Sequence, residues 1–342
     1  MSTRPRHVLD GGTFVTGALV TEHGQPAHRG EHQLSQPGRG QCLIRVTAAP
    51  IVPLDLLCAS GTSYFGPPGL PYVPGVQGVG EVVRGDTLSP GTRVWFNTDA
   101  GMRPGDGSLA EAAVVEESET VRLPVGVEDA AVAALGLSAV AAWHALSRAA
   151  LRAGEQVLVT GASGVVGQVA VQVAAALGAG RIVAATRSAE GRDRALRTGA
   201  DAVVDLAGAD VDGLEARISE AVDGRLDVVI DPVCGDCATA ALRVLGDGGR
   251  LVNLGSAGGS TAAFDSASLR SGSQTIVGYT NASLTLAQRA EALSGVLRLA
   301  ADGRCEVDYQ TVDLDAISDA WQHVASASHT ARTVVLPGRA PE

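Results

Sequence analysis

A glycine-rich turn, GASGVVG from Gly161 to Gly167, has the residue types in this sequence that are best suited to chemistry. A short apolar run, Val157 to Thr160, precedes the turn, and apolar residues at helical spacing follow it. A second apolar run, Arg181 to Thr186, closes the segment. Strand, glycine turn, helix and strand within about thirty residues are typical of a dinucleotide-binding βαβ unit.

The chemistry expected at this turn is the binding of a pyrophosphate. Small residues let the backbone approach the anion closely, and the start of the helix offers unpaired N–H groups and the positive end of the helix dipole. The sequence therefore predicts cofactor contacts from five residues of the turn: Ser163, Gly164, Val165, Val166 and Gly167.

Other reactive motifs fail on specific residues. A phosphate loop needs Gly-Lys-Ser or Gly-Lys-Thr, and the chain contains no lysine, which also excludes a Tyr-x-x-x-Lys catalytic pair. A nucleophile elbow needs G-x-S-x-G, and Val165 stands where the second glycine is required. Cys234 and Cys237 form a C-x-x-C pair that could be a redox dithiol or half of a zinc site; because no second pair exists, we interpret them as packing residues.

The composition indicates a globular protein with an acidic balance. The 342 residues suffice for two domains, and 45% of them are hydrophobic. A net charge of −11 disfavours nucleic acid and anionic membranes as partners. We find no run of about 18 apolar residues and no signal peptide in residues 1–12. Five scattered cysteines indicate reduced thiols, so we expect a cytoplasmic location. The expected partner is a small-molecule substrate.

Strand and helix signals divide the chain into three parts. The first, up to about Pro124, contains short candidate strands separated by Gly and Pro clusters, which predicts a partly open β-barrel: Gln41–Thr47, Val79–Arg84, Thr92–Asn97 and Glu111–Val115. An alanine-rich helix over 128–150, interrupted near Gly136, leads into strands that alternate with helices, which predicts a doubly wound parallel sheet. The last part adds a strand, two helices and a closing strand: Gln274–Tyr279, Leu286–Asp302, Leu314–Ala327 and Arg332–Pro337.

This order of parts resembles the medium-chain dehydrogenase/reductase superfamily, and most closely its zinc-independent quinone oxidoreductase and enoyl reductase branch. Besides the glycine turn, four stretches carry the resemblance: LPYVPGVQGVGEVV (Leu70 to Val83), LDVVIDPVCG (Leu226 to Gly235), GGRLVNLG (Gly248 to Gly255) and RTVVLP (Arg332 to Pro337). The resemblance implies an α/β protein in which a Rossmann domain is inserted into a β-rich, GroES-like catalytic domain. We expect the catalytic domain at 1–125 and 266–342, and the dinucleotide-binding domain at 126–265.

The residues at the zinc-ligand positions of this superfamily have changed. Zinc-dependent members carry Cys-His-x-Asp and Gly-His-Glu, and the matching positions here read Val52-Pro53-Leu54-Asp55 and Gly75-Val76-Gln77. Valine cannot bind zinc, and no cysteine lies between Phe96 and Leu109, where a structural zinc lobe would need four. We therefore expect no metal.

Charge at the end of the second strand of the βαβ unit indicates which dinucleotide binds. NAD-binding proteins usually hold an acidic residue there, whereas this chain has Thr186, Arg187 and Ser188, followed by Arg192. Arginines and hydroxyls suit a 2′-phosphate, so we predict NADPH. The resemblance adds five further cofactor-binding candidates: Pro232, Leu254, Gly255, Ser256 and Arg332.

The substrate pocket is less clearly marked. Quinone reductases of the branch often have Asn-x-x-Asp followed by Arg-x-Gly-x-Tyr, where this chain keeps Asp55 and Gly61 and places Tyr64 one residue late. Tyr64 is the candidate proton or hydrogen-bond donor, and packing of its loop is the alternative. The candidate pocket walls are Asp55, Tyr72, Trp95, Asn97, Tyr279 and Asn281.

Together these features predict an NADPH-dependent reductase that transfers hydride to a quinone, or to the C=C bond of an enone or enoyl thioester, without zinc. The alternatives are a non-catalytic NADPH-binding protein, or a reductase of specialised metabolism that acts on another conjugated acceptor. The resemblance also implies a homodimer formed through the late strand 274–279.

Overall fold

A computed structural model describes residues 13–326 and 331–338, so the segment 1–12, in which we find no signal peptide, lies outside the described residues. The chain forms two compact units: Met1–Gly136 with Asp308–Glu342, and Leu137–Val307. We expected the return to the first unit at residue 266. The second unit instead runs on to Val307, so it includes the helices Ser266–Ser271 and Leu286–Ala301 and the strand Thr275–Gly278.

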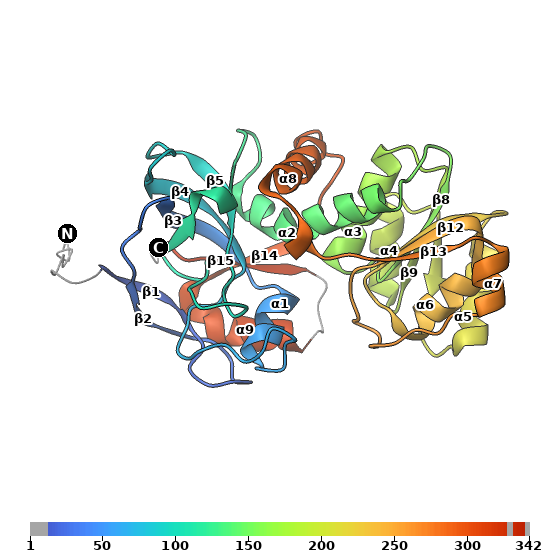
Figure 1. The fold of residues 1–342 in the computed structure, drawn as a ribbon, viewed down its shortest axis with the longest axis horizontal. Helices are drawn as coiled ribbons and strands as arrows, with labels where there is room; N and C mark the ends of the chain where they lie inside the picture. The colour runs from blue at the N-terminus through green and yellow to red at the C-terminus, as the bar shows by residue number, and fades with distance from the viewer. Residues whose placement is uncertain (1–12, 327–330, 339–342) are drawn as a thin grey trace. The chain divides into compact units, whose positions relative to one another are not determined.

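The second unit is a six-stranded parallel sheet with helices (Figure 1). Its strands are β8 (Gln156–Thr160), β9 (Arg181–Thr186), β10 (Ala202–Asp205), β11 (Leu226–Asp231), β12 (Leu245–Asn253) and β13 (Thr275–Gly278). Its helices are α3 (Val165–Ala176), α4 (Ala189–Arg197), α5 (Val211–Ala221), α6 (Gly235–Val244), α7 (Ser266–Ser271) and α8 (Leu286–Ala301), with the short 3₁₀ turn η2 (Asn281–Ser283). The strand order β10-β9-β8-β11-β12-β13 is that of a doubly wound dinucleotide-binding fold.

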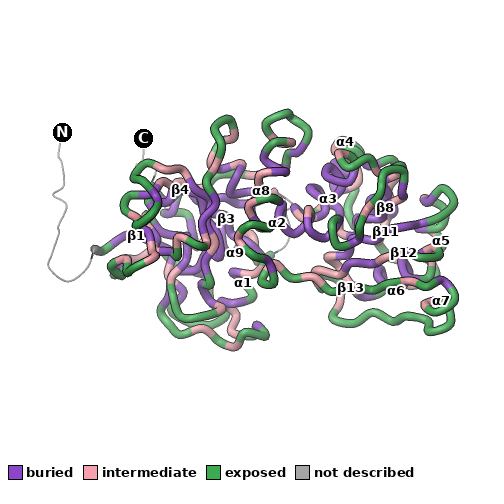
Figure 2. Tube along the Cα trace, turned by 45° about the horizontal axis from the view of Figure 1, so that its top comes forward, coloured by how far each residue is buried: buried purple, intermediate pink, exposed green. Residues whose placement is uncertain are grey.

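Burial explains why the central strands form. All six residues of β11 are buried, and so are the last four of β8 (Figure 2). Parallel strands covered on both faces need a largely apolar sequence, which the central residues of LDVVID and QVLVT provide. β13 lies at one edge of the sheet and is largely exposed.

The first unit is built from both ends of the chain. Its strands are β1 (Thr13–Leu19), β2 (His28–Leu34), β3 (Gln41–Pro50), β4 (Gln77–Arg84), β5 (Arg93–Asn97), β6 (Ala112–Glu116), β7 (Thr120–Arg122), β14 (Tyr309–Asp313) and β15 (Arg332–Leu336). Its helices are α1 (Pro53–Ala59) and α9 (Ile317–Ala325), with the 3₁₀ turns η1 (Glu117–Glu119) and η3 (Leu314–Ala316).

The long strand β3 organises the sheet of the first unit. It pairs with β4 on one side and with β6 and β15 on the other, so the C-terminal strand joins a sheet made by the N-terminal part. The prediction of a Rossmann domain inserted into a GroES-like domain is confirmed.

Several elements differ from the prediction. Helix α1 was missed, and the helix expected over 314–327 begins as η3 and continues as α9 to Ala325. α9 packs against α1 and β2. The helix α2 (Asp129–Arg148) is broken at Gly136, where φ is 29° and ψ is −125°. The predicted interruption near Gly136 is confirmed.

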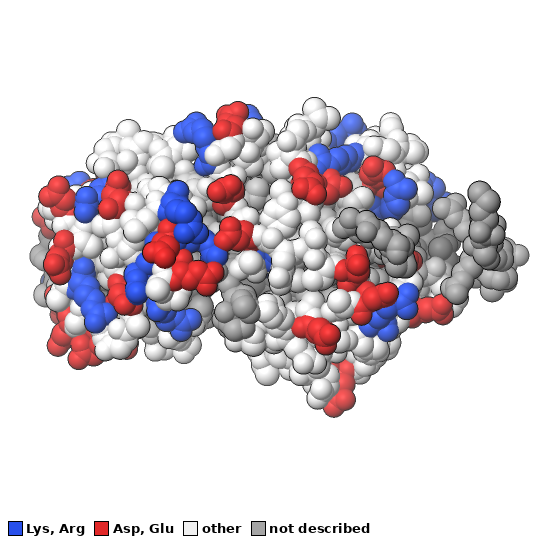
Figure 3. Space-filling view, turned by 180° about the vertical axis from the view of Figure 1, so that it is seen from behind, with Lys and Arg blue, Asp and Glu red and all other residues white. Residues whose placement is uncertain are grey.

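The long helix α2 has the length and hydropathy of a membrane span, although 78% of its most apolar 18-residue window is buried inside the protein. Burial of this kind is expected of a core helix. On the face drawn in Figure 3, arginines lie among carboxylates.

Candidate cofactor and substrate site

The glycine turn occupies the carboxyl edge of the parallel sheet, between β8 and α3. The strand order reverses between β8 and β11, and ligands of such sheets bind at this point. Gly161 has a φ of +59°, which favours glycine. At Gly167 a Cβ atom would lie 2.5 Å from the Gly161 carbonyl oxygen, so the turn is closed too tightly for a side chain there.

The first turn of α3 offers free N–H groups. Gly164 is the N-cap with no side-chain cap, and within the described residues the amides of Val165, Val166 and Gly167 have no hydrogen-bond acceptor. Val165 is buried and is the first residue of α3, a helical position that does not require glycine. The arrangement fits a pyrophosphate bound by backbone donors.

The residues predicted to bind a 2′-phosphate lie together at the end of β9, and they differ in availability. Thr186 is buried, and the Ser188 hydroxyl accepts from the Gly191 N–H as the N-cap of α4. Arg192 pairs with Asp205 at 2.7 Å. Arg187 is exposed, and its guanidinium has no partner among the described residues. Arg187 is therefore the cation most available to a phosphate.

The loops after β11 and β12 hold the other predicted cofactor residues of this unit. Pro232 and Leu254–Ser256 follow these strands at the same carboxyl edge. A Cβ at Gly255 would lie 2.6 Å from the Pro232 carbonyl oxygen, so the two loops are in contact. Sequence reasoning missed the buried Asp231, although an acid at the end of the apolar run LDVVID marks the carboxyl end of a parallel strand.

Asp55, predicted as a pocket wall, is buried in the first unit. Only 1% of it is exposed, and its two oxygens accept from the Val52 N–H at 2.8 Å and the Val76 N–H at 2.9 Å. Burial raises the pKa of the Asp55 carboxyl to about 6, against the lowering effect of these amides and of Arg332. Both carboxylate oxygens therefore accept hydrogen bonds from the backbone of the first unit.

Arg332, predicted to reach the cofactor, is also buried in the first unit. It lies in β15, and its Nη1 donates to the Ile51 carbonyl at 3.2 Å. Burial lowers the pKa of the Arg332 guanidinium to about 10, and the nearby Asp55 opposes this. The resemblance suggested a cofactor contact, whereas here the side chain lies beside Asp55.

The aromatic candidates Trp95 and Tyr72 differ in whether they line a cavity. Trp95 is fully buried and donates from Nε1 to Gln77 Oε1 at 2.9 Å. Tyr72 lines a hollow of about 310 Å³ with Pro71, Gly101 and neighbouring residues.

The other two candidates of the first unit are accessible. Tyr64 is 81% exposed and stacks on Phe65 at a ring separation of 4.2 Å. Asn97 ends β5 half-buried, with no side-chain hydrogen bond among the described residues.

Tyr279 and Asn281 are brought together in the second unit, directly after β13. The Tyr279 hydroxyl donates to Asn281 Oδ1 at 2.6 Å, and the Asn281 amide donates to the Leu137 carbonyl at 3.1 Å. Burial raises the pKa of the Tyr279 phenol well above its usual value, so the hydroxyl stays protonated. The pair is held in place and remains a candidate pocket wall.

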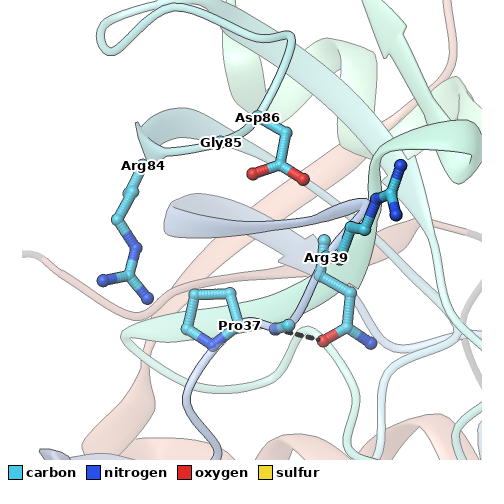
Figure 4. A pocket seen from close by; sticks show the side chains of 7 residues that line it. Pro37, Arg39, Arg84, Gly85 and Asp86 are labelled. Atoms are coloured by element: carbon cyan, nitrogen blue, oxygen red, sulfur yellow. Dashed lines mark hydrogen bonds between the residues drawn. The ribbon is translucent and has the colours of Figure 1, made fainter.

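A larger hollow, of about 490 Å³, lies on the first unit (Figure 4). Its lining comes from the β2–β3 turn and the end of β4 and includes Arg39, Arg84 and Asp86. Asp86 accepts from the Gly40 N–H at 2.8 Å. None of the predicted substrate residues lines it, so we do not assign the substrate to it.

The remaining groups to consider are the metal-ligating side chains and the paired cysteines. Across 13–326 and 331–338, no group of three His, Cys, Asp or Glu side chains could hold a metal ion. Cys234 and Cys237 are free thiols, and burial raises the pKa of the Cys237 thiol to about 12. A thiol with so high a pKa is a poor nucleophile.

Comparison with known proteins agrees with this arrangement. Residues 38–125 match the alcohol dehydrogenase GroES-like domain family, and residues 165–301 match the zinc-binding dehydrogenase family. A quinone oxidoreductase-like protein 2 of Bos taurus is 30% identical over 82% of this chain and 80% of its own length. A zinc-type alcohol dehydrogenase-like protein of Schizosaccharomyces pombe is 33% identical over 64% of this chain, which spans 62% of that protein.

A solved structure extends the comparison to the whole fold. The quinone oxidoreductase of Thermus thermophilus, solved also as its complex with NADPH, is 26% identical over 94% of this chain and 99% of its own, with a TM-score of 0.78. Fold and glycine turn define a protein of the dinucleotide-binding class. The chain belongs to the medium-chain dehydrogenase/reductase superfamily, in its quinone oxidoreductase-like branch.

Proposed function

We propose that this chain is an NADPH-dependent reductase that transfers hydride to a quinone or to the C=C bond of an α,β-unsaturated carbonyl. The open first turn of α3, with three unpaired amides in the described part of the chain, carries the proposal because it is a ready anion site at the carboxyl edge of the sheet. The quinone oxidoreductase names of the bovine relative and the Thermus protein support the acceptor class.

Different segments of the second unit bind different parts of the cofactor. The turn 161–167 receives the pyrophosphate, and the free guanidinium of Arg187 receives the 2′-phosphate. Loops 232–235 and 254–259 bound the nicotinamide end. When bound, NADPH supplies the hydride, and the protein contributes its position and the exclusion of water.

Reduction of a conjugated carbonyl places negative charge on the carbonyl oxygen, which needs a hydrogen-bond donor. A backbone N–H, a ribose hydroxyl of the cofactor and Tyr64 are the candidate donors. Because Tyr64 is 81% exposed and has no hydrogen bond among the described residues, it is the least preorganised of the three. The proton for the α-carbon then comes from water.

The test is NADPH oxidation by the purified chain against quinones, enones and enoyl thioesters, with identification of each product. We expect turnover with at least one conjugated acceptor and a reduced C=C bond or a hydroquinone as the product. Binding of NADPH without turnover on any acceptor would instead establish a non-catalytic binding protein. Turnover of an ester without any cofactor would indicate a hydrolase and contradict the proposal.

We also propose a homodimer formed through β13 and a cytoplasmic location. β13 is an edge strand with Ile276 42% exposed, and an uncovered edge can pair with a second copy. The free thiols of all five cysteines agree with a reducing compartment. Light scattering of the wild type and of Ile276→Lys tests the dimer: the wild type should have twice the mass of the variant.

A further inference from the structure

A buried carboxylate lies beneath the predicted cofactor loops. Asp231 ends β11 with no exposed surface, and its Oδ1 accepts from the Thr160 hydroxyl at 2.6 Å. The same oxygen accepts from the N–H groups of Val233 at 3.1 Å and Cys234 at 2.9 Å. Oδ2 accepts from the Asn253 side-chain amide at 2.8 Å. The donors therefore come from the ends of three adjacent strands, β8, β11 and β12.

Each of these donors leads directly into a loop of the site. Thr160 precedes the glycine turn, and Cys234 precedes α6 with an unusual φ of 59° and ψ of −155°. The amide of Asn253 also donates to the Gly255 carbonyl at 2.9 Å, so it joins the carboxylate to the loop 254–259. The Asp231 carboxylate is thus hydrogen-bonded to the residues at which three loops begin.

Packing above the carboxylate joins the same loops. A Cβ at Gly161 would lie 2.7 Å from Val233 Cγ2, and a Cβ at Gly258 would lie 2.6 Å from Val233 Cγ1. The Gly258 N–H donates to the Val233 carbonyl at 2.7 Å. Val233 therefore touches the pyrophosphate turn on one side and the loop 254–259 on the other.

We propose that Asp231 is a positioning residue that ties the turn 161–167 to the loop 254–259, so that the affinity for NADPH depends on its carboxylate. The inference rests on the proposed function, because the two loops are assigned there to opposite ends of the cofactor. A carboxylate suits this position since it accepts four hydrogen bonds and donates none. An asparagine would turn its NH₂ group toward the NH₂ group of Asn253.

The experiment measures two quantities on the full chain: the Kd for NADPH, and amide hydrogen exchange at Gly258 without cofactor. The test variants are Asp231→Asn and Thr160→Val, in which a methyl group replaces the Thr160 hydroxyl that donates to Asp231. Thr160→Ser keeps the hydroxyl and is the conservative variant. The matched control is Asp227→Asn. Asp227 is buried at the opposite end of the same strand and accepts from the Gln156 N–H at 2.9 Å.

We expect Asp231→Asn and Thr160→Val to raise the Kd about tenfold and to speed exchange at Gly258, whereas Thr160→Ser stays within about twofold of the wild type. Asp227→Asn should lower the melting temperature and leave both quantities unchanged. A folded Thr160→Val variant with wild-type Kd and exchange would overturn the inference. So would equal effects from Asp227→Asn, because affinity would then simply follow stability.

The two proposals fail in different ways. If the wild type binds no NADPH, the proposed function is wrong, and exchange at Gly258 in Thr160→Val still decides whether the carboxylate ties the loops. If the wild type binds NADPH and Thr160→Val behaves like Thr160→Ser, only the role of Asp231 is wrong. If Asp231→Asn does not fold, the two Thr160 variants carry the test.

Discussion

The predicted sites of the two compact units are built from different kinds of group. In the unit 137–307 the site consists mainly of backbone: free amides at the start of α3 and glycines where loops touch. In the unit made by the chain ends, three predicted site residues, Asp55, Trp95 and Arg332, are buried and hydrogen-bonded to the scaffold. A substitution in the first kind of site leaves the backbone donors in place, whereas in the second it removes the hydrogen-bonding group itself.

The largest expected effect comes from closing the backbone site. Gly164→Asp places a carboxylate at the N-cap of α3, where a Cβ meets nothing closer than the Gly161 carbonyl oxygen at 3.5 Å. We expect NADPH affinity to fall roughly 100-fold, because the new charge repels the pyrophosphate and takes up the free amides. Fluorescence titration measures the affinity.

The same variant should fold well, because aspartate is at least as good an N-cap as glycine. Gly164→Ala is the control and should bind within a few-fold of the wild type. A Gly164→Asp protein that binds NADPH as tightly as the wild type would contradict the binding of the pyrophosphate by the free amides at the start of α3.

The buried side chains of the other unit predict a loss of stability instead of affinity. Asp55→Asn places an NH₂ group where a carboxylate oxygen accepts from the Val52 or the Val76 N–H. One backbone N–H thereby loses its acceptor, which lowers the free energy of unfolding by about 2 kcal/mol at neutral pH. NADPH affinity should stay unchanged. Urea unfolding measures the free energy, and a stable variant with altered affinity would contradict the structural role of Asp55.

The pH dependence of that loss has a defined sign. Burial raises the pKa of Asp55 from 3.8 to about 6 in the folded state, so protonation stabilises the folded chain. The contribution is fully present below pH 3.8 and disappears as the pH rises through about 6. The difference in unfolding free energy between the wild type and Asp55→Asn should therefore narrow by up to about 3 kcal/mol as the pH rises from 3.8 to above about 6. A constant gap would show an unshifted pKa for Asp55, and a gap that widens as the pH rises would show a lowered one; either result contradicts the prediction.

The same contrast explains what the sequence alone could predict. The Rossmann unit was predictable because QVLVT, the glycine turn and LDVVID each carry a local pattern of burial or backbone conformation. The partnership of Thr160 with Asp231 joins residues 71 positions apart, and no local pattern encodes it. The burial of Asp55 likewise depends on β15, which arrives from the far end of the chain.

Removing the positive charge of Arg187, at the end of β9, is expected to have a smaller effect that is selective for NADPH over NADH. Arg187→Ala should weaken NADPH binding about tenfold and leave NADH binding unchanged, because only NADPH has the 2′-phosphate. Arg197→Ala, at an exposed arginine of α4 with no partner in the described part of the chain, is the matched control. Equal losses for both dinucleotides, or equal losses in the control, would contradict a specific phosphate contact.

The smallest expected effect concerns Tyr64, the candidate donor that the side-chain site offers. Its hydroxyl is exposed and unbonded within the described residues, and a donor without a fixed position stabilises a developing charge little more than water does. We expect Tyr64→Phe to lower kcat less than about threefold and to leave its pH profile unchanged. A large fall in kcat at unchanged KM would show instead that substrate binding orders this loop, and that the side-chain site contributes directly to the reaction.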